Sequence, residues 1–524
     1  MTLSRADREF RYPGVTFIDY KQLDMDRVLT GLLQRLRWGG SSGILLRTRD
    51  VTVDDFVATM TEHPELFGGF EESVTRRWVE THLVDMVNRG KATQAVAGLR
   101  PLHGYTYHFR NSRRSRSYGA DEQIYSMIEH APARYANTLP LLREFFFAGV
   151  DTNTDESRPG AQIDVETQAL INLSKAAEGE ITDRKSQAER RNDPPLYPEA
   201  AELLANDTVR LLFHKNLIPR SVLVDYLKIL FAFHLGLYHL QVMKVLPARL
   251  AGKRARPDGG FFLDVGGVPE TTAAALAERS AATWYGRISG YVPATFTMKR
   301  LEDFARYLVK RRKRTPPPTG FFTVDDLLLL NGSAWKDDRA TFAESKLANV
   351  LEDSRGDSEL PPEIVQLQEL DDDPFTTYVN VITAYRMAFH RKYIRECLDS
   401  LLLKNRPGAM LAQPRRGERR FVLDGRLLEV LLQIALLKPG GRQGFHTEKL
   451  RVDEFLTILR DRYGLYIDRL PAGDGFDRPS IIEQRALRDN TRAFTTRLRE
   501  IGFYSDLSDA YLTQTITPRY VIEP

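Results

Sequence analysis

Near the carboxyl end of the chain, four arginines recur at spacings that place them on one helix face: Arg485, Arg488, Arg492 and Arg499. At about 100° per residue they fall within about 60° of one another, and Thr496 falls beside them. The apolar residues of the same segment fall on the opposite side: Leu487, Phe494, Leu498 and Ile501. Guanidinium groups bind phosphates and guanine edges. The pattern therefore predicts a DNA contact. The alternative is a solvated helix face on a domain that serves protein assembly.

The segment that carries these arginines has the start and stop signals of a helix. Ser480, followed three residues later by Glu483, is a capping-box pattern, and Gly502 comes directly after the last apolar residue. Two more helices are predicted upstream, over 427–435 and 452–459, and a strand-like run, Tyr511–Thr517, follows. Three helices followed by a hairpin are typical of a winged-helix domain, whose last helix can enter a major groove. We therefore predict a winged-helix-like domain over residues 406–524.

A second basic cluster lies in the first third of the chain. Its four cations are Arg110, Arg113, Arg114 and Arg116, and they interleave with Tyr105, Tyr107, Phe109 and Tyr118. Cations for phosphates next to rings for stacking are typical of nucleic-acid binding. The alternative is a mobile basic loop beside an aromatic strand. A third cluster, Lys310–Arg314, ends a predicted helix, where the helix dipole favours bases without any ligand.

The sequence offers little that could carry catalysis. It contains no G-x-x-x-x-G-K-[ST] phosphate loop and no zinc-protease, serine-hydrolase or zinc-deaminase signature. The best acidic candidate is Asp264 in the strand-like run Phe261–Val265, where it could hold a metal for phosphodiester cleavage. No second carboxylate and lysine follow at a useful spacing, so a strand-end Asp that begins a turn is the favoured interpretation. We predict no catalytic residue, no metal site and no cofactor.

Composition narrows the class of protein. The 524 residues carry a net charge of +4, and of the 74 basic residues 17 are lysines and 57 are arginines. A net charge of +4 is too small for a histone-like DNA-binding protein. The single cysteine, Cys397, excludes a disulfide framework. The longest apolar stretch, Ser221–Leu246, is interrupted by charged residues and histidines, so we predict a core helix, no membrane span and a cytoplasmic protein.

Composition shifts along the chain suggest four segments. We predict an N-terminal α+β domain over 1–150, a linker or exposed segment over 151–198 and a helical core domain over 199–405, ahead of the winged-helix-like domain over 406–524. Strand-like runs are expected at Val15–Asp19 and Gly43–Leu46. The fold class predicted is therefore mainly α and multidomain.

Two stretches of the tail resemble a bacterial defence-island family. They are RYGLYIDRLPAGDGFDRPSI at 462–481 and LREIGFYSDLSDAYLTQTITPRY at 498–520. The family is the seventh component of the methylation-associated anti-phage defence systems, and the likeness is clearest over 421–520. The resemblance implies a cytoplasmic subunit that works beside a DNA methyltransferase and ATP-using or nuclease partners. It implies no catalytic residues.

These observations predict a non-catalytic DNA-binding subunit of a multi-protein bacterial anti-phage system, with DNA and defence proteins such as a methyltransferase or ATPase as partners. The predicted DNA contacts are Arg485, Arg488, Arg492, Arg499, Thr496, Arg110, Arg113, Arg114 and Arg116. Two alternatives stay open. One is a protein–protein scaffold without direct DNA contact, and the other is a divergent metal-dependent nuclease centred on Asp264.

Overall fold

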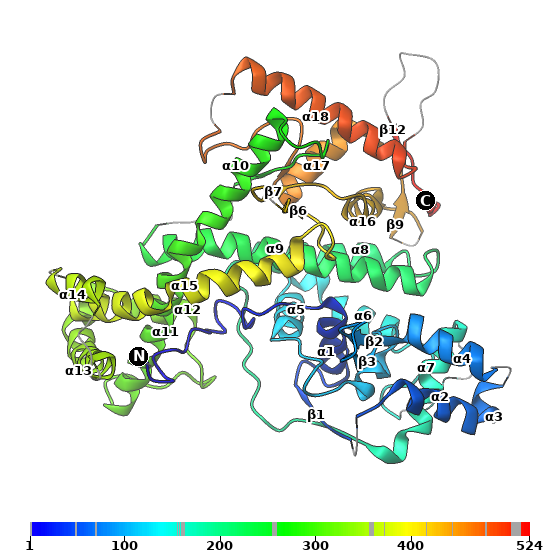
Figure 1. Ribbon diagram of the computed structural model, residues 1–524, viewed down its shortest axis with the longest axis horizontal. Coiled ribbons are helices and arrows are strands. Elements are labelled where there is room, and N and C mark those ends of the chain that lie inside the picture. Colours follow the sequence, from blue (N-terminus) through cyan, green and yellow to red (C-terminus); the bar gives the residue numbers. More distant parts are fainter. Residues whose placement is uncertain are drawn as a thin grey trace.

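The structure is a computed structural model of the chain. It describes residues 3–47, 50–68, 71–154, 156, 158, 163–253, 259–355, 361–370, 372–415, 417–442, 444–476, 479–504 and 515–524. Helices form most of the regular structure, and the strands form small two-stranded pairs, which confirms a mainly α protein. Figure 1 shows α8 (Pro198–Leu212) and α9 (Arg220–Leu250) across the middle of the molecule, with the N-terminal elements on one side and the C-terminal elements on the other.

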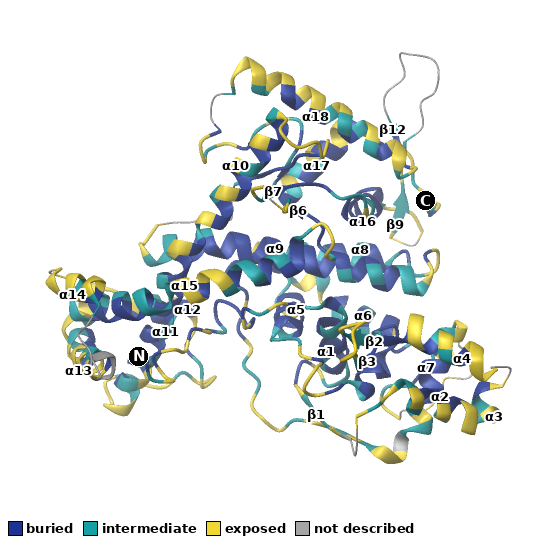
Figure 2. Ribbon diagram, viewed as in Figure 1, coloured by how far each residue is buried: buried dark blue, intermediate teal, exposed yellow. Residues whose placement is uncertain are grey.

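The central helix α9 is buried on all sides. Every residue from Ile229 to Met243 is buried, because the helix is apolar around its whole circumference and neighbours cover each face (Figure 2). It is long and apolar enough to cross a membrane, yet 94% of its most apolar window lies inside the protein. This is the placement predicted for a core helix. His234 and His239 point to different partners within that core, Asp207 and Thr16.

The N-terminal side combines helices with two strand pairs. Helices α1 (Met25–Arg37), α5 (Ala120–Glu129) and α6 (Thr138–Phe146) pack beneath α8 and α9. Strand β1 (Gly43–Arg47) pairs antiparallel with β4 (Ile181–Lys185), so the strand predicted at 43–46 is confirmed. The second pair is β2 (Val84–Val87) with β3 (Ala95–Leu99). The remaining helices of this side are α2 (Val53–Glu62), α3 (Pro64–Phe67), α4 (Glu72–Trp78) and α7 (Val165–Ala176).

The strand predicted at 15–19 is wrong. This stretch is an irregular segment whose polar groups bond to side chains instead of to a neighbouring strand. Thr16 Oγ1 and Phe17 N both donate to Gln123 Oε1, at 3.2 and 2.9 Å. The strand-like composition reflects burial, since all four residues from Val15 to Ile18 are buried.

The N-terminal tract is part of the central core. Tyr12 donates its hydroxyl hydrogen to Phe322 O (2.6 Å), and the hydroxyls of Tyr20 and Tyr291 lie 2.6 Å apart. These contacts reach α11 (Ile288–Lys310) and the loop beyond it, and α15 (Pro374–Leu402) packs against α11 and α9. One hydrophobic cluster runs from Leu3 to Ile516 through all four predicted segments. The domain boundaries therefore stay a prediction.

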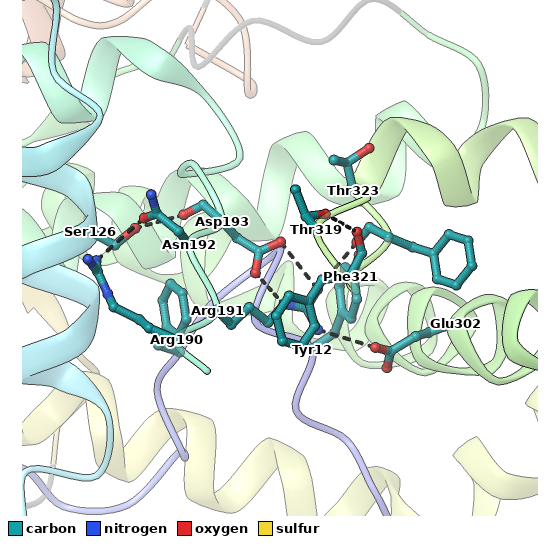
Figure 3. A network of polar contacts seen from close by, with 12 residues as sticks. Tyr12, Ser126, Arg190, Arg191, Asn192, Asp193, Glu302, Thr319, Phe321 and Thr323 are labelled. Carbon is teal, nitrogen blue, oxygen red and sulfur yellow. Dashed lines mark hydrogen bonds and ion pairs between the residues drawn. The ribbon is translucent and has the colours of Figure 1, made fainter. Parts of the chain in front are cut away.

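Arg191 ties the N-terminal side to the α11 region through a polar network (Figure 3). Its guanidinium pairs with Asp193, lies 3.2 Å from Glu302 Oε1 of α11 and covers the Tyr12 ring at 4.9 Å. Ser126 Oγ of α5 donates to Asp193 O (2.7 Å). The stretch around 190–193, within the predicted linker, is thus held in place by contacts with Tyr12, α5 and α11.

The C-terminal side contains the three helices predicted for it. They are α16 (Gly425–Ala435), α17 (Val452–Tyr463) and α18 (Ile481–Glu500). Between the first two, β8 (Leu437–Pro439) and β9 (Phe445–Thr447) form a hairpin, and β10 (Leu450–Arg451) pairs antiparallel with β12 (Thr515–Ile516). Of the strand predicted at 511–517, residues 511–514 lie outside the described residues.

A segment from the middle of the chain joins this side. Strand β5 (Phe261–Phe262) pairs in parallel with β11 (Leu465–Tyr466), and α10 (Thr272–Gly286) packs against α18. In Figure 1, green α10 stands among the orange and red C-terminal elements. Strands β6 (Leu411–Ala412) and β7 (Arg420–Phe421) pair antiparallel, and a single bridge joins Leu411 to Leu403, the residue after α15. Residues 259–286 therefore help to position α18.

Candidate nucleic-acid interface

Helix α18 begins and ends where its sequence signals place it. Ser480 Oγ accepts a hydrogen bond from Glu483 N (3.3 Å), and Glu483 Oε2 accepts one from Ser480 N (2.7 Å), so the predicted capping box is present. The helix is capped at Ile501, and Gly502 follows with φ +76°, a left-handed conformation that favours glycine. The helix that carries the arginines is therefore fixed at both ends.

The inward side of α18 is anchored by apolar residues and by one amide. Phe494 and Leu498 are fully buried, and Leu487 joins a small cluster with Phe262 and Leu276. Asn490, 3% exposed, satisfies three backbone groups of two other segments: it donates to Leu263 O (2.8 Å) and Ile467 O (3.0 Å) and accepts from Val265 N (2.9 Å). The sequence interpretation missed this residue. The sequence feature that could have identified Asn490 is its position at about 140° from Arg485, a single amide on the apolar side of the helix.

The outward side of α18 is the arginine face, defined here as Arg485, Arg488, Arg492, Thr496 and Arg499. All five residues are exposed, and Figure 2 shows exposed residues along the outer edge of the helix. Arg492 makes an exposed pair with Asp489 (3.1 Å), Arg499 lies over the Tyr504 ring at 5.2 Å, and within the described part of the chain Arg485 and Arg488 have no acidic partner. Exposed pairs of this kind are weak. The guanidinium groups of Arg485 and Arg488 are thus presented to solvent.

The N-terminal basic cluster is arranged differently from the prediction. Tyr105, Tyr107 and Phe109 lie in a short 3-10 helix, Gly104–Phe109, and are at most 6% exposed. They pack inward, and the Tyr107 hydroxyl donates to Asp183 (2.6 Å). The expectation that these rings stack on bases is therefore wrong, because all three belong to the core.

The cations of that cluster divide into two groups. Arg113 and Arg114 are exposed on a turn whose backbone N–H groups donate to Asn111 Oδ1. Arg110 is half-buried and lines a pocket together with Arg116. The loop 110–119 leads into α5, which lies across the α8–α9 layer from α18 (Figure 1). The structure therefore does not bring the two predicted groups of DNA contacts onto one surface.

Asp264 is the anion of a buried ion pair. It is 2% exposed, and Arg420 Nε lies 3.3 Å from its Oδ2, an ion pair whose geometry falls short of a hydrogen bond. Burial raises the pKa of Asp264, and the hydrogen bond from Gly267 N and the charge of Arg420 offset this only in part. Within the described residues no group of three metal-ligating side chains occurs. The geometry gives no support to a nuclease site.

Cys397 is buried as well, and burial raises the pKa of its thiol to about 12.

We expect Asp264→Asn to lower the free energy of unfolding by about 1–3 kcal/mol, because the buried Arg420 loses its counter-ion while the Gly267 contact survives. Urea denaturation measures this cost. With magnesium or manganese present, we expect no difference between the variant and the unchanged protein in the cleavage of plasmid DNA. Metal-dependent cleavage that disappears in the variant would restore the nuclease alternative.

A comparison with known protein families matches residues 5–520 to the family described as methylation-associated defense system protein MAD7. The chain belongs to this family. The resemblance predicted from the tail is thus confirmed and extends over essentially the whole chain. The MAD7 protein is a component of a methylation-associated defence system, and other proteins of that system are its partners. No curated protein and no solved structure gives a significant match.

Proposed function

We propose that this defence-system component binds double-stranded DNA through the arginine face of α18 and has no catalytic role of its own. The observation that carries the proposal is the exposed row of arginines on a helix whose other side is locked by Phe494, Leu498 and Asn490. A rigid helix with outward guanidinium groups can lie along a groove without prior rearrangement. The protein would act in the cytoplasm, beside partners such as a methyltransferase or ATPase.

The surrounding elements support a winged-helix-like arrangement. After α16, strand β10 pairs with β12, and a single bridge joins Tyr504 to Ile516. The described order is α16, the β8–β9 hairpin, β10, α17, β11, α18 and β12. Two helices followed by a strand that returns to β10 are the part of this order that resembles domains whose last helix enters the major groove. In this arrangement Arg485, Arg488 and Arg492 would contact phosphates or guanine edges. Thr496 and Arg499 would extend the contact toward the end of the helix.

The first test removes the centre of the arginine face. In Arg485→Ala/Arg488→Ala/Arg492→Ala we expect affinity for a double-stranded oligonucleotide to fall roughly 10- to 100-fold near physiological salt, because three cations next to the phosphates are lost. Fluorescence anisotropy of a labelled duplex measures the change.

The matched control is Lys310→Ala/Arg311→Ala/Arg312→Ala, which removes the same charge from exposed residues at the end of α11. We expect less than a threefold change for this variant. An equal loss in both variants would mean that net charge alone, and not the arginine face, attracts DNA.

One observation favours the scaffold alternative. Ile481 and Ile482, the first two residues of α18, are 85% and 69% exposed. Neighbouring large apolar side chains in solvent are typical of a protein contact. If α18 docks a partner protein, the purified chain should show no DNA affinity, and the three-arginine variant should instead lose co-purification with the other defence proteins.

A further inference from the structure

A pocket lined by charged residues lies far from α18, where three segments of the chain meet. The N-terminal tract around 8–21, the loop 110–118 and residues 389–393 in the middle of α15 line an open pocket of about 640 Å³. We call it the junction pocket. Its volume falls in the range of small-molecule sites, roughly 300–1,000 Å³.

The walls of the junction pocket are held in place by backbone contacts. Asp19 N donates to Tyr118 O (2.9 Å), which joins the N-terminal tract to the loop. Gly119 has φ +80°, and a Cβ at this position would lie 2.1 Å from Phe17 O. Only glycine permits this close approach, so the pocket is formed before any ligand enters.

The pocket carries an excess of positive charge. Its cations are Arg8, Arg11, Lys21, Arg110 and Arg116, and its acids are Glu9 and Asp19. Arg11 contacts Asp19 only at 3.7 Å. Within the described part of the chain, the guanidinium groups of Arg110 and Arg116 have no hydrogen-bond or ion-pair partner. Burial lowers the pKa of Arg110, and the charges of Asp121 and Asp183 offset this only in part. Arg116 is exposed, so both guanidinium groups can pair with an anion that enters the pocket.

Two aromatic rings of α15 also line the pocket. Phe389 is 38% exposed, Tyr393 is half-buried, and their ring centroids lie 4.4 Å apart. Lys21 Nζ lies 4.3 Å from the Tyr393 centroid. Such rings at the mouth of a basic pocket offer a face on which a planar base can stack.

A buried histidine with an unused nitrogen also lines the pocket. His390 is 6% exposed and stacks on Phe10 at 3.9 Å, and its Nε2 has no hydrogen-bond partner among the described residues. Burial and the charges of Arg386 and Lys21 lower its pKa to about 3, so the ring is neutral at physiological pH. A neutral imidazole can donate to or accept from a polar edge of a ligand.

We propose that the junction pocket binds a nucleotide, with its phosphate at Arg110 and Arg116 and its base on Phe389 and Tyr393. The shared chemistry fits either a free nucleotide or the 5′-terminal nucleotide of a DNA strand. This site is separate from the arginine face of α18 and does not depend on the function proposed for that face.

Isothermal titration of the full chain with deoxyadenosine 5′-monophosphate tests the proposal. Arg110→Met/Arg116→Ala should weaken binding at least tenfold, and so should Phe389→Ser, a change at an exposed position that leaves the core intact. The control Arg113→Ala/Arg114→Ala removes two exposed arginines of the same loop that do not line the pocket, and its affinity should be unchanged.

Three results would overturn the proposal: no binding at millimolar nucleotide, equal affinity for inorganic phosphate, or equal losses in the control. A competition arm separates the two sources of ligand. Two hairpin DNAs are compared, one with a 5′-phosphate and one with a 5′-hydroxyl. If only the phosphorylated hairpin displaces the nucleotide, the pocket binds strand ends. Failure of both hairpins to compete assigns it to free nucleotides. The three-arginine variant of α18 should bind the nucleotide normally.

Discussion

Asp207→Asn should lower the free energy of unfolding by about 3–5 kcal/mol, because it breaks a fully buried ion pair. Asp207 of α8 is 0% exposed and accepts hydrogen bonds from His234 Nε2 (3.0 Å), Tyr463 Oη (2.9 Å) and Arg462 Nε (3.1 Å). An Asn side chain would turn an NH₂ group toward one of these donors and leave the Arg462 charge unpaired. The carboxylate joins α8 and α9 to α17, so its loss weakens the support of the C-terminal side.

Urea denaturation at neutral pH measures this cost, and Asp461→Asn is the matched control. Asp461 is the neighbour of Arg462, but its side chain is 66% exposed and, among the described residues, pairs only with Arg460. We expect the control to change stability by less than about 0.5 kcal/mol. A cost below 1 kcal/mol for Asp207→Asn would contradict the role given to this carboxylate.

The same carboxylate predicts a pH dependence. Burial alone would raise the pKa of Asp207, but the hydrogen bond from His234 and the charge of Arg462 outweigh it and lower the pKa below 3.8. A folded pKa below the unfolded one means that the stabilisation is present above the unfolded pKa and is lost as pH falls through the folded one. The stability gap between the unchanged protein and Asp207→Asn should therefore narrow in acid, below about pH 4.

Glu302→Gln should cost about 3 kcal/mol of unfolding free energy, because Glu302 is a buried anion that pairs with Arg191 in the network of Figure 3. It is 2% exposed, and three cations surround it: Lys299 (2.7 Å), Arg306 (2.9 Å) and Arg191 (3.2 Å). Burial would raise the pKa of Glu302, and these cations lower it. Without the Glu302 charge, Asp193 is the one remaining counter-ion of Arg191 among the described residues.

This loss should also loosen the stretch around 190–193. Limited proteolysis of the variant should cut this stretch faster than in the unchanged protein, whereas Glu189→Gln, an exposed acid of the same stretch, should match the unchanged protein in both assays. Equal proteolysis rates for all three would show that the network does not hold the segment.

The arginine face could be predicted from the sequence because its cause is local. The capping box, the stop at Gly502 and the 3.6-residue period all lie within 23 residues, from Ser480 to Gly502, and the structure confirms the helix they define. The same local logic failed for 105–109, whose rings next to arginines were interpreted as open for stacking on nucleic acid. A buried 3-10 helix was formed instead, since neighbouring segments cover all three rings.

The parts that the sequence could not predict depend on long-range contacts. Asn490 and Val265 are 225 positions apart, and no local pattern links them. The junction pocket likewise joins the N-terminal tract to Phe389 and Tyr393 of α15, so these two rings lie in a different stretch of sequence from Arg110 and Arg116. Of the pocket residues, the sequence singled out Arg110, Arg116 and Tyr118.

The salt dependence of DNA binding tests the central claim most directly. Each phosphate neutralised by an arginine contributes about 0.9 to the slope of log affinity against log salt. Arg485→Ala/Arg488→Ala/Arg492→Ala should therefore flatten this slope by about 2.7, while Lys310→Ala/Arg311→Ala/Arg312→Ala should leave it unchanged. A slope that is equal in all three proteins, or an unchanged protein with no affinity for DNA, would contradict the account.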